Sequence, residues 1–183
     1  MQAIIQNIKE NGDEALFSYT KQFDKADINA SNVKVTDEEF EEAYKAVDPA
    51  LLDVIRKALV NIESYHELQK QNSWFKSTPQ GTMLGQKVTP LEKVGVYVPG
   101  GKAVYPSSVL MNIMPAKVAG VDKIIMTTPC NAEGKVNPAV LVAAKEAGAD
   151  EVYKAGGAQA IACLLYTSPS PRDLSTSRMP SSA

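Results

Sequence analysis

Two pairs of adjacent glycines are placed where a ligand-binding turn would need them. The first pair, Gly100 and Gly101, follows an apolar, β-branched run at residues 94–98 that favours a buried strand. Glycine lets another group approach the backbone closely, and Ser107 and Ser108 stand soon afterwards where a helix would be capped. A helix N-terminus attracts anionic groups, so strand, glycine turn and helix together predict an anion-binding turn. A tight turn without a ligand stays open, because the loop is not a G-x-G-x-x-G motif.

The second pair, Gly156 and Gly157, comes at the end of a regular alternation of short apolar runs and helical patterns. Strands are expected at residues 94–98, 123–127 and 151–154, and helices at 109–118 and 137–148 and from 158 onward. Pro115 is expected to kink the first of these helices or delay its start. Such alternation with short connections indicates a parallel sheet with right-handed crossovers. Both glycine pairs then lie at the carboxyl ends of strands, where open α/β sheets bind ligands.

Side chains that ligate metals are scarce in this sequence. His66 is the single histidine, and a histidine near the end of an amphipathic helix is usually a surface or interface residue. Zinc needs three or four ligands, and no cysteine, second histidine or carboxylate cluster stands at ligand spacing around it. We therefore assign no metal ligand and no catalytic residue within the chain.

Composition narrows the class of protein. The 183 residues are 44% hydrophobic and 22% charged, as in ordinary globular domains. A net charge of -2 gives no reason to expect nucleic acid or an anionic membrane as a partner. No apolar run approaches the roughly 20 residues of a transmembrane helix. The two cysteines, Cys130 and Cys163, form no disulfide framework, which favours a reducing, cytoplasmic compartment.

Residues 1–80 are expected to form an N-terminal helical region. Helix signals are a break at Gly12, a capping box at Thr36 and Glu39, and a start at Asp48 and Pro49. The last of these begins a long amphipathic helix that runs to about residue 70. Trp74 and Phe75 then fall in a polar linker, which we expect them to dock onto the body of the protein.

Residues 81–163 are expected to form a Rossmann-like α/β part, opening with a strand at 82–88. Residues 164–183 are rich in serine and proline without periodicity, and such a segment cannot bury enough apolar area to order itself. It is either a natural flexible tail or sequence foreign to the protein. We favour foreign sequence, because the composition changes inside a helix that has barely begun, near Ala162. The predicted fold is thus a helical arm followed by a Rossmann-like parallel sheet, incomplete because the chain is truncated.

Several segments, taken in order, resemble histidinol dehydrogenases. They are residues 12–16, 23–25, 61–63, 94–101, 108–111, 115–120 and 156–162. The runs G-V-Y-V-P-G-G at 95–101 and G-G-A-Q-A-I-A at 156–162 are the most specific of them. The likeness covers nearly all of residues 1–162.

This resemblance implies an enzyme that oxidises L-histidinol to L-histidine through the aldehyde, the last step of histidine biosynthesis. It implies NAD and zinc as cofactors and a homodimer as the assembly. Tyr97 and Gln159 match cofactor-binding residues of the family, and Gly100 and Gly101 form the adjoining turn. A tyrosine offers a flat face with a polar tip, and a glutamine amide offers a donor and an acceptor. Without a cofactor role, Tyr97 would be a core residue and Gln159 a surface residue at a helix start.

The resemblance also implies what this chain does not contain. The family's zinc ligands, catalytic pair and substrate-binding residues lie further along than Ala162, so the chain as written is expected to be inactive. A related dehydrogenase of another small alcohol, such as a sulfonated diol, would share the same motifs. A non-catalytic α/β module that binds a nucleotide or a partner is the remaining alternative.

Overall fold

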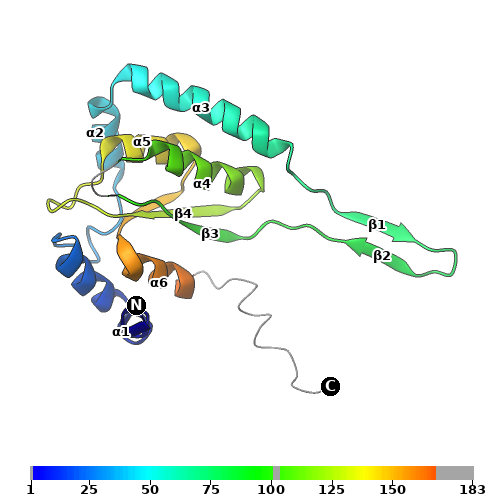
Figure 1. Ribbon diagram of the computed structural model, residues 1–183, viewed down its shortest axis with the longest axis horizontal. Helices are drawn as coiled ribbons and strands as arrows, with labels where there is room; N and C mark the ends of the chain where they lie inside the picture. The colour runs from blue at the N-terminus through cyan, green and yellow to red at the C-terminus, as the bar shows by residue number, and fades with distance from the viewer. Residues whose placement is uncertain (1, 101–103, 168–183) are drawn as a thin grey trace.

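The computed structural model describes residues 2–100 and 104–167 and is shown in Figure 1. The elements in chain order are α1 (Gln2–Phe23), α2 (Asp37–Ala46), α3 (Pro49–Glu67), β1 (Trp74–Ser77), β2 (Met83–Gln86), β3 (Lys93–Tyr97), α4 (Pro106–Val118), β4 (Lys123–Thr128), α5 (Pro138–Ala147), β5 (Glu151–Lys154) and α6 (Gly157–Thr167). The expected α/β class with an N-terminal helical region is confirmed.

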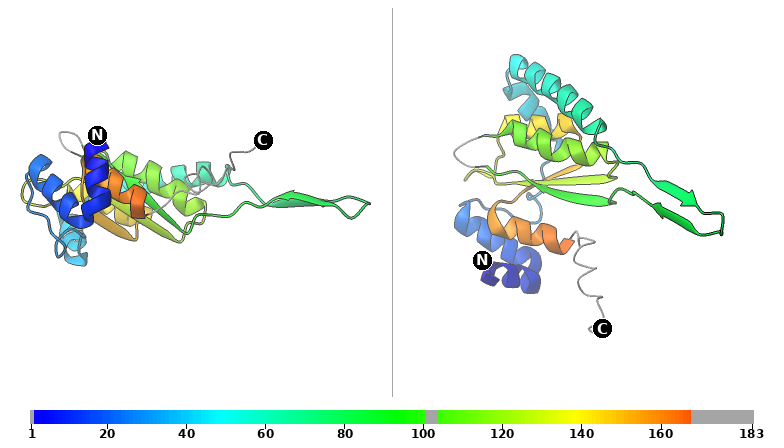
Figure 2. Two further views of the ribbon diagram at one scale, coloured as in Figure 1. Left: turned by 90° about the horizontal axis from the view of Figure 1, so that it is seen from below. Right: turned by 45° about the vertical axis from the view of Figure 1, so that its right-hand side comes forward.

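A parallel sheet of order β3-β4-β5 forms the centre of the molecule, as the alternation of elements predicts. Figures 1 and 2 show α4 and α5 on one face of this sheet, with α3 beyond them. On the opposite face lies α6, with α1 packed against it. The sheet is therefore covered on both sides, and the central strand β4 is apolar at Ile124, Ile125 and Met126 in succession, as expected of a strand with both faces covered.

Several helix boundaries follow the local sequence signals. Thr36 and Glu39 form the expected capping box at the start of α2, and the Asp48 carboxylate accepts a hydrogen bond from the Ala50 N–H to cap α3. Within α1 the backbone breaks at Gly12, where φ is 55° and ψ is -128°. Glycine tolerates this positive φ, so the predicted division into two helical pieces is confirmed.

The start of α4 differs from the expectation. The helix begins at Pro106, and Tyr105 occupies the N-cap position without a side-chain hydrogen bond, so the serine cap at Ser107 and Ser108 is wrong. Proline suits the first helical position because its missing N–H would have no partner there. Pro115 lies inside the helix, which continues to Val118, so it does not delay the start.

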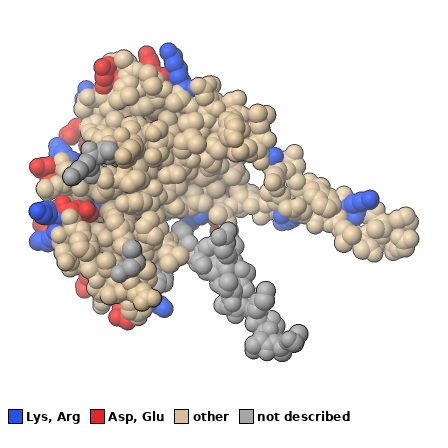
Figure 3. Space-filling view, viewed as in Figure 1, with Lys and Arg blue, Asp and Glu red and all other residues tan. Residues whose placement is uncertain are grey.

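The largest difference is a β-hairpin that the sequence reading treats as a linker and a single strand. Strands β1 and β2 pair antiparallel, with Trp74 opposite Gln86 and Phe75 opposite Gly85. The boundary expected at residue 80 falls in the turn of this hairpin. Trp74 and Phe75 are 55% and 62% exposed, so the expectation that they dock onto the body is wrong. In Figure 3 the hairpin projects from the body as an arm, while acidic side chains gather on the body.

Two apolar clusters hold the layers together. The larger lies between the sheet and α2 to α5, and its fully buried members include Val98, Ile113 and Met126. The smaller joins α1 to α6 through residues such as Ile8, Leu16 and Ala160. No helix among the described residues is both long enough and apolar enough to cross a membrane.

Candidate functional site

The carboxyl ends of the three parallel strands meet around Pro129. A Cβ atom built on Gly100, after β3, would lie 2.7 Å from the Pro129 Cγ, and one built on Gly156, after β5, would lie 2.6 Å from the Pro129 Cβ. Real Cβ atoms are not found at such distances, so these positions favour glycine because the Pro129 ring approaches them closely. The structure thus brings Gly100 and the second glycine pair to one edge, as predicted. Gly101 lies outside the described residues.

Tyr97 closes β3 and reaches across to the start of α6. The Gly157 N–H donates a hydrogen bond to the Tyr97 hydroxyl oxygen at 3.2 Å. The ring packs, half-buried, against the cluster that joins α1 to α6. Because a phenol oxygen can accept one hydrogen bond and still donate its own proton, Tyr97 keeps a donor for a further group.

Gln159 lies in the first turn of α6 and is 1% exposed. This burial makes the surface reading of Gln159 wrong. Its Nε2 atom has no hydrogen-bond partner among the described residues, and leaving such a group unpaired usually costs about 1–3 kcal/mol. An unpaired buried amide at the carboxyl end of β5 is therefore a position where a ligand or a water molecule would supply the partner.

Thr127 is a second buried polar residue at this edge, which the sequence reading does not single out. It lies opposite both Tyr97 and Tyr153 in the sheet register, and its Oγ1 atom also lacks a partner among the described residues. Its position at the carboxyl end of β4 is the signal that could have identified it.

A pocket of about 370 Å³ opens beside this edge. Its lining comes from the turns after β3 and β4 and from the start of α5, and includes Gly100, Pro129, Cys130, Lys135 and Asn137. The Asn137 side chain accepts a hydrogen bond from the Ala139 N–H and so caps α5. Lys135 and the positive end of the α5 dipole give this mostly apolar pocket a preference for anions.

Cys130 is not prepared for nucleophilic chemistry. Burial, and secondly the nearby negative charge of Asp24, raise the pKa of the Cys130 thiol. A reactive cysteine needs a lowered pKa, so this thiol acts as an apolar wall of the pocket.

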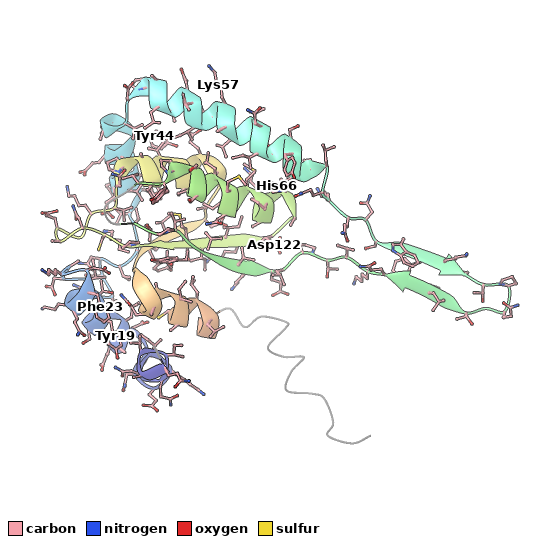
Figure 4. All side chains as sticks on the ribbon, viewed as in Figure 1. Tyr19, Phe23, Tyr44, Lys57, His66 and Asp122 are labelled. Atoms are coloured by element: carbon pink, nitrogen blue, oxygen red, sulfur yellow. The ribbon has the colours of Figure 1, made fainter. Side chains whose placement is uncertain are left out.

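His66 lies away from the carboxyl ends of the parallel strands. Figure 4 shows it at the end of α3, where the chain leaves the body toward the hairpin. Its Nδ1 atom lies 2.7 Å from the Gln69 Oε1 atom. Over residues 2–100 and 104–167, no group of three or more histidine, cysteine, aspartate or glutamate side chains is arranged to hold a metal ion. These residues therefore offer zinc no site.

Comparison with known proteins decides the family. Residues 1–173 match the family model described as histidinol dehydrogenase. The chain belongs to the histidinol dehydrogenase family. It is 57% identical over 166 residues to the histidinol dehydrogenase of Bacillus subtilis and 53% identical over 163 residues to that of Heliobacterium mobile. These matches cover 91% and 89% of the chain.

The fold agrees with the family. The crystal structure of histidinol dehydrogenase from Elizabethkingia anophelis superposes with a TM-score of 0.84 at 37% identity, over 92% of this chain. The chain spans 38% of that structure and 38% of both curated relatives. The resemblance seen in the sequence motifs is thereby confirmed.

Proposed function

We propose that this chain is part of an NAD- and zinc-dependent dehydrogenase that oxidises L-histidinol to L-histidine through the aldehyde. The support is that the chain belongs to a family whose curated relatives are named histidinol dehydrogenase. Within the chain, one observation carries the proposal: the buried Gln159 amide nitrogen has no partner among residues 2–100 and 104–167, and it lies at the edge where parallel α/β sheets bind ligands.

The residues proposed for this site would suit a dinucleotide. Gln159 would donate a hydrogen bond from its unpaired amide, and Tyr97 would offer its ring face and its hydroxyl proton. Gly100 would keep the adjoining turn free of a side chain, and Lys135, which lines the neighbouring pocket, would face an anionic phosphate. The same role is proposed for Gly101 on the sequence resemblance alone. NAD held by these residues would supply a hydride acceptor for oxidation of the alcohol carbon. The role proposed for the residues named above is to bind and orient this cofactor.

Zinc is proposed for the full-length protein, with ligands outside residues 1–162. Oxidation of an alcohol needs a base for its proton, and in this family a metal to polarise its oxygen. We also propose that the full-length protein is a homodimer and works in the cytoplasm, as the family resemblance implies.

Binding of NAD to the purified 183-residue chain, measured by isothermal titration calorimetry, tests the cofactor proposal. Gln159→Leu removes the amide while keeping most of the side-chain volume, and should weaken binding about tenfold, the factor that one hydrogen bond of about 1.4 kcal/mol supplies. Gln6→Leu on the exposed surface of α1 is the matched control and should bind as the parent does. Equal binding by Gln159→Leu, or no binding by the parent, would overturn the proposed role.

A further inference from the structure

Asp24 holds a buried carboxylate oxygen without a hydrogen-bond donor. Asp24 follows the last residue of α1, and its N–H donates to the Thr20 carbonyl at 2.9 Å. Its Oδ2 atom is buried and has no hydrogen-bond partner among residues 2–100 and 104–167. Burial raises the pKa of the Asp24 carboxyl, because the charged form loses hydration. A buried acceptor without a donor lowers stability, so its presence needs another reason.

The position at the end of α1 makes this carboxylate more unfavourable still. The carboxyl end of a helix carries a partial negative charge, which repels an anion. Directly after Asp24, Lys25 takes a φ of 57°, a left-handed conformation that helix ends usually give to glycine. Two unfavourable features thus coincide at Asp24. Features of this kind gather at binding sites, where a ligand supplies the missing interaction.

The segment that follows α1 lies along the carboxyl edge of the parallel sheet. The Ile28 Cδ1 atom lies 3.5 Å from a Cβ atom built on Gly134, in the loop after β4. The negative charge of Asp24 reaches the Cys130 thiol, which lines the pocket at this edge. Figure 4 shows Phe23, the chain neighbour of Asp24, on the side of the molecule where β4 ends. Asp24 therefore belongs to the edge that holds the proposed cofactor residues.

The parallel strands themselves bring no acidic side chain to this edge. Residues 98–100, 129–131 and 155–156 follow β3, β4 and β5 and contain no aspartate or glutamate. Glu39 already accepts a hydrogen bond from Lys154, and Glu133 is exposed. Dinucleotide-binding α/β sheets commonly use an acidic residue to accept a hydrogen bond from a ribose hydroxyl. In this chain Asp24, at the end of α1, is the half-buried acid without a partner.

A ribose offers the donors that the Asp24 carboxylate lacks. Its two neighbouring hydroxyls can both donate, and a carboxylate has two oxygens that accept. The same carboxylate repels the 2′-phosphate that distinguishes NADP from NAD, because both groups are negative. Gln159 supplies a donor at this edge, so donor and acceptor would come from different elements.

We propose that Asp24 accepts hydrogen bonds from the adenosine ribose of NAD and thereby selects NAD over NADP. The inference rests on the proposed function and adds to it a residue that determines cofactor specificity. Asp24 acts in binding alone and takes no part in the transfer of hydride.

Calorimetric titration of both dinucleotides into the 183-residue chain tests this selection. The parent chain should bind NAD about tenfold more tightly than NADP, the factor that one hydrogen bond supplies. Asp24→Asn keeps the shape but removes the charge, and should reduce this preference about fivefold by weakening NAD binding. Asp27→Asn is the matched control, because Asp27 is exposed and pairs with the exposed Lys21, and it should leave the preference unchanged. An unchanged preference in Asp24→Asn would overturn the proposal.

Gln159→Leu in the same titration separates this inference from the cofactor site itself. If Gln159→Leu weakens binding of both dinucleotides while Asp24→Asn leaves their ratio unchanged, the site remains and selection by Asp24 is wrong. If the parent chain binds neither dinucleotide, the proposed function and this inference are both wrong.

Stability gives a readout that distinguishes a binding role from a structural one. Asp24→Asn removes an unpaired charge from the negative end of a helix, so the variant should unfold at a higher urea concentration than the parent. A lower midpoint would make Asp24 a structural residue and overturn the proposal. In a chimera in which residues 1–162 replace the matched part of the Bacillus subtilis relative, Asp24→Asn should lower the ratio of kcat/KM for NAD to that for NADP. An unchanged ratio there would also overturn the proposal.

Discussion

At the scale of single residues, Tyr97 combines a structural contact with the proposed cofactor contact. In the intact enzyme, Tyr97→Ala should raise KM for NAD more than it lowers kcat, because binding contacts act equally in ground and transition states. The lost binding free energy should be about 1–3 kcal/mol. Tyr97→Phe should lower the free energy of unfolding by about 1 kcal/mol, since the Gly157 N–H loses its acceptor. Steady-state kinetics and urea denaturation separate the two effects. Unchanged NAD dependence together with lower stability would show that Tyr97 only packs.

Gly101→Val in the intact enzyme should raise KM for NAD more than Tyr97→Ala does. A valine side chain at this position of the turn would crowd a cofactor bound beside it, whereas glycine leaves that space free. Titration of NAD against each variant measures the difference. A smaller increase than that of Tyr97→Ala would count against a cofactor role for this turn.

Glu151 makes stability depend on pH. Its carboxylate accepts hydrogen bonds from Lys34 at 3.0 Å and Lys123 at 3.1 Å, and these partners lower the pKa of Glu151 to about 2. Because the folded-state pKa lies below the unfolded value, the unfolded chain binds more protons between these values, and stability is lost as pH falls from about 4.5 to 2. Glu151→Gln should flatten this dependence and cost about 1 kcal/mol at pH 7, since both lysines are partly exposed. An unchanged pH profile, measured by thermal melts, would contradict the assignment.

At the scale of elements, Glu39 connects the start of α2 to the end of β5. One carboxylate oxygen accepts from the Thr36 N–H at 3.0 Å, and the other from the buried Lys154 ammonium at 2.6 Å. Glu39→Ala should therefore cost about 3–5 kcal/mol, because it leaves a buried charge unpaired, whereas Thr36→Ala should cost about 1 kcal/mol. In the Glu39→Ala variant, a second change of Lys154→Met should recover part of the lost free energy of unfolding, as measured by urea denaturation. If Glu39→Ala and Thr36→Ala lowered the free energy of unfolding equally, the role of Glu39 would be helix capping alone.

At the scale of the whole molecule, the described residues hold the edge proposed to bind the cofactor, and no group of three or more metal-ligating side chains lies among them. The 183-residue chain should therefore not reduce NAD with histidinol, with or without zinc, because the described residues contain no metal-ligand cluster. Absorbance of the reduced cofactor is the measurement. Zinc-dependent reduction by the purified chain would contradict this expectation.

The sheet has an open edge as well. Residues 33–35 pair with the outer edge of β5, where the Lys154 N–H donates to the Val33 carbonyl. Within the described residues no strand pairs with the outer edge of β3. Since α6 lies on the opposite face from α4 and α5, a right-handed crossover would bring a following strand to this edge. We expect marginal stability or aggregation of this chain. A cooperative melt of the monomer above about 60 °C would contradict this.

The sequence by itself determined most of the local structure and the family. Helix starts at Thr36, Asp48 and Asn137 depend on side chains that bond to their own backbone neighbours, so nearby residues suffice to predict them. The parallel sheet follows from the alternation of elements and the handedness of crossovers. The two glycine-rich runs identified the family because they are specific in order and spacing.

Only the tertiary structure decided which groups are buried and which remain uncovered. The Gln159 Nε2 atom lies buried with no partner among the described residues, and Lys154 meets Glu39 across 115 residues of sequence. Packing of distant elements, rather than the local pattern, decides both. The β1–β2 hairpin shows the opposite case. Trp74 and Phe75 are residue types typical of a core, yet they lie exposed on this hairpin. Residue type sets how much burial would stabilise a side chain, but only the folded arrangement provides or withholds the surface that buries it.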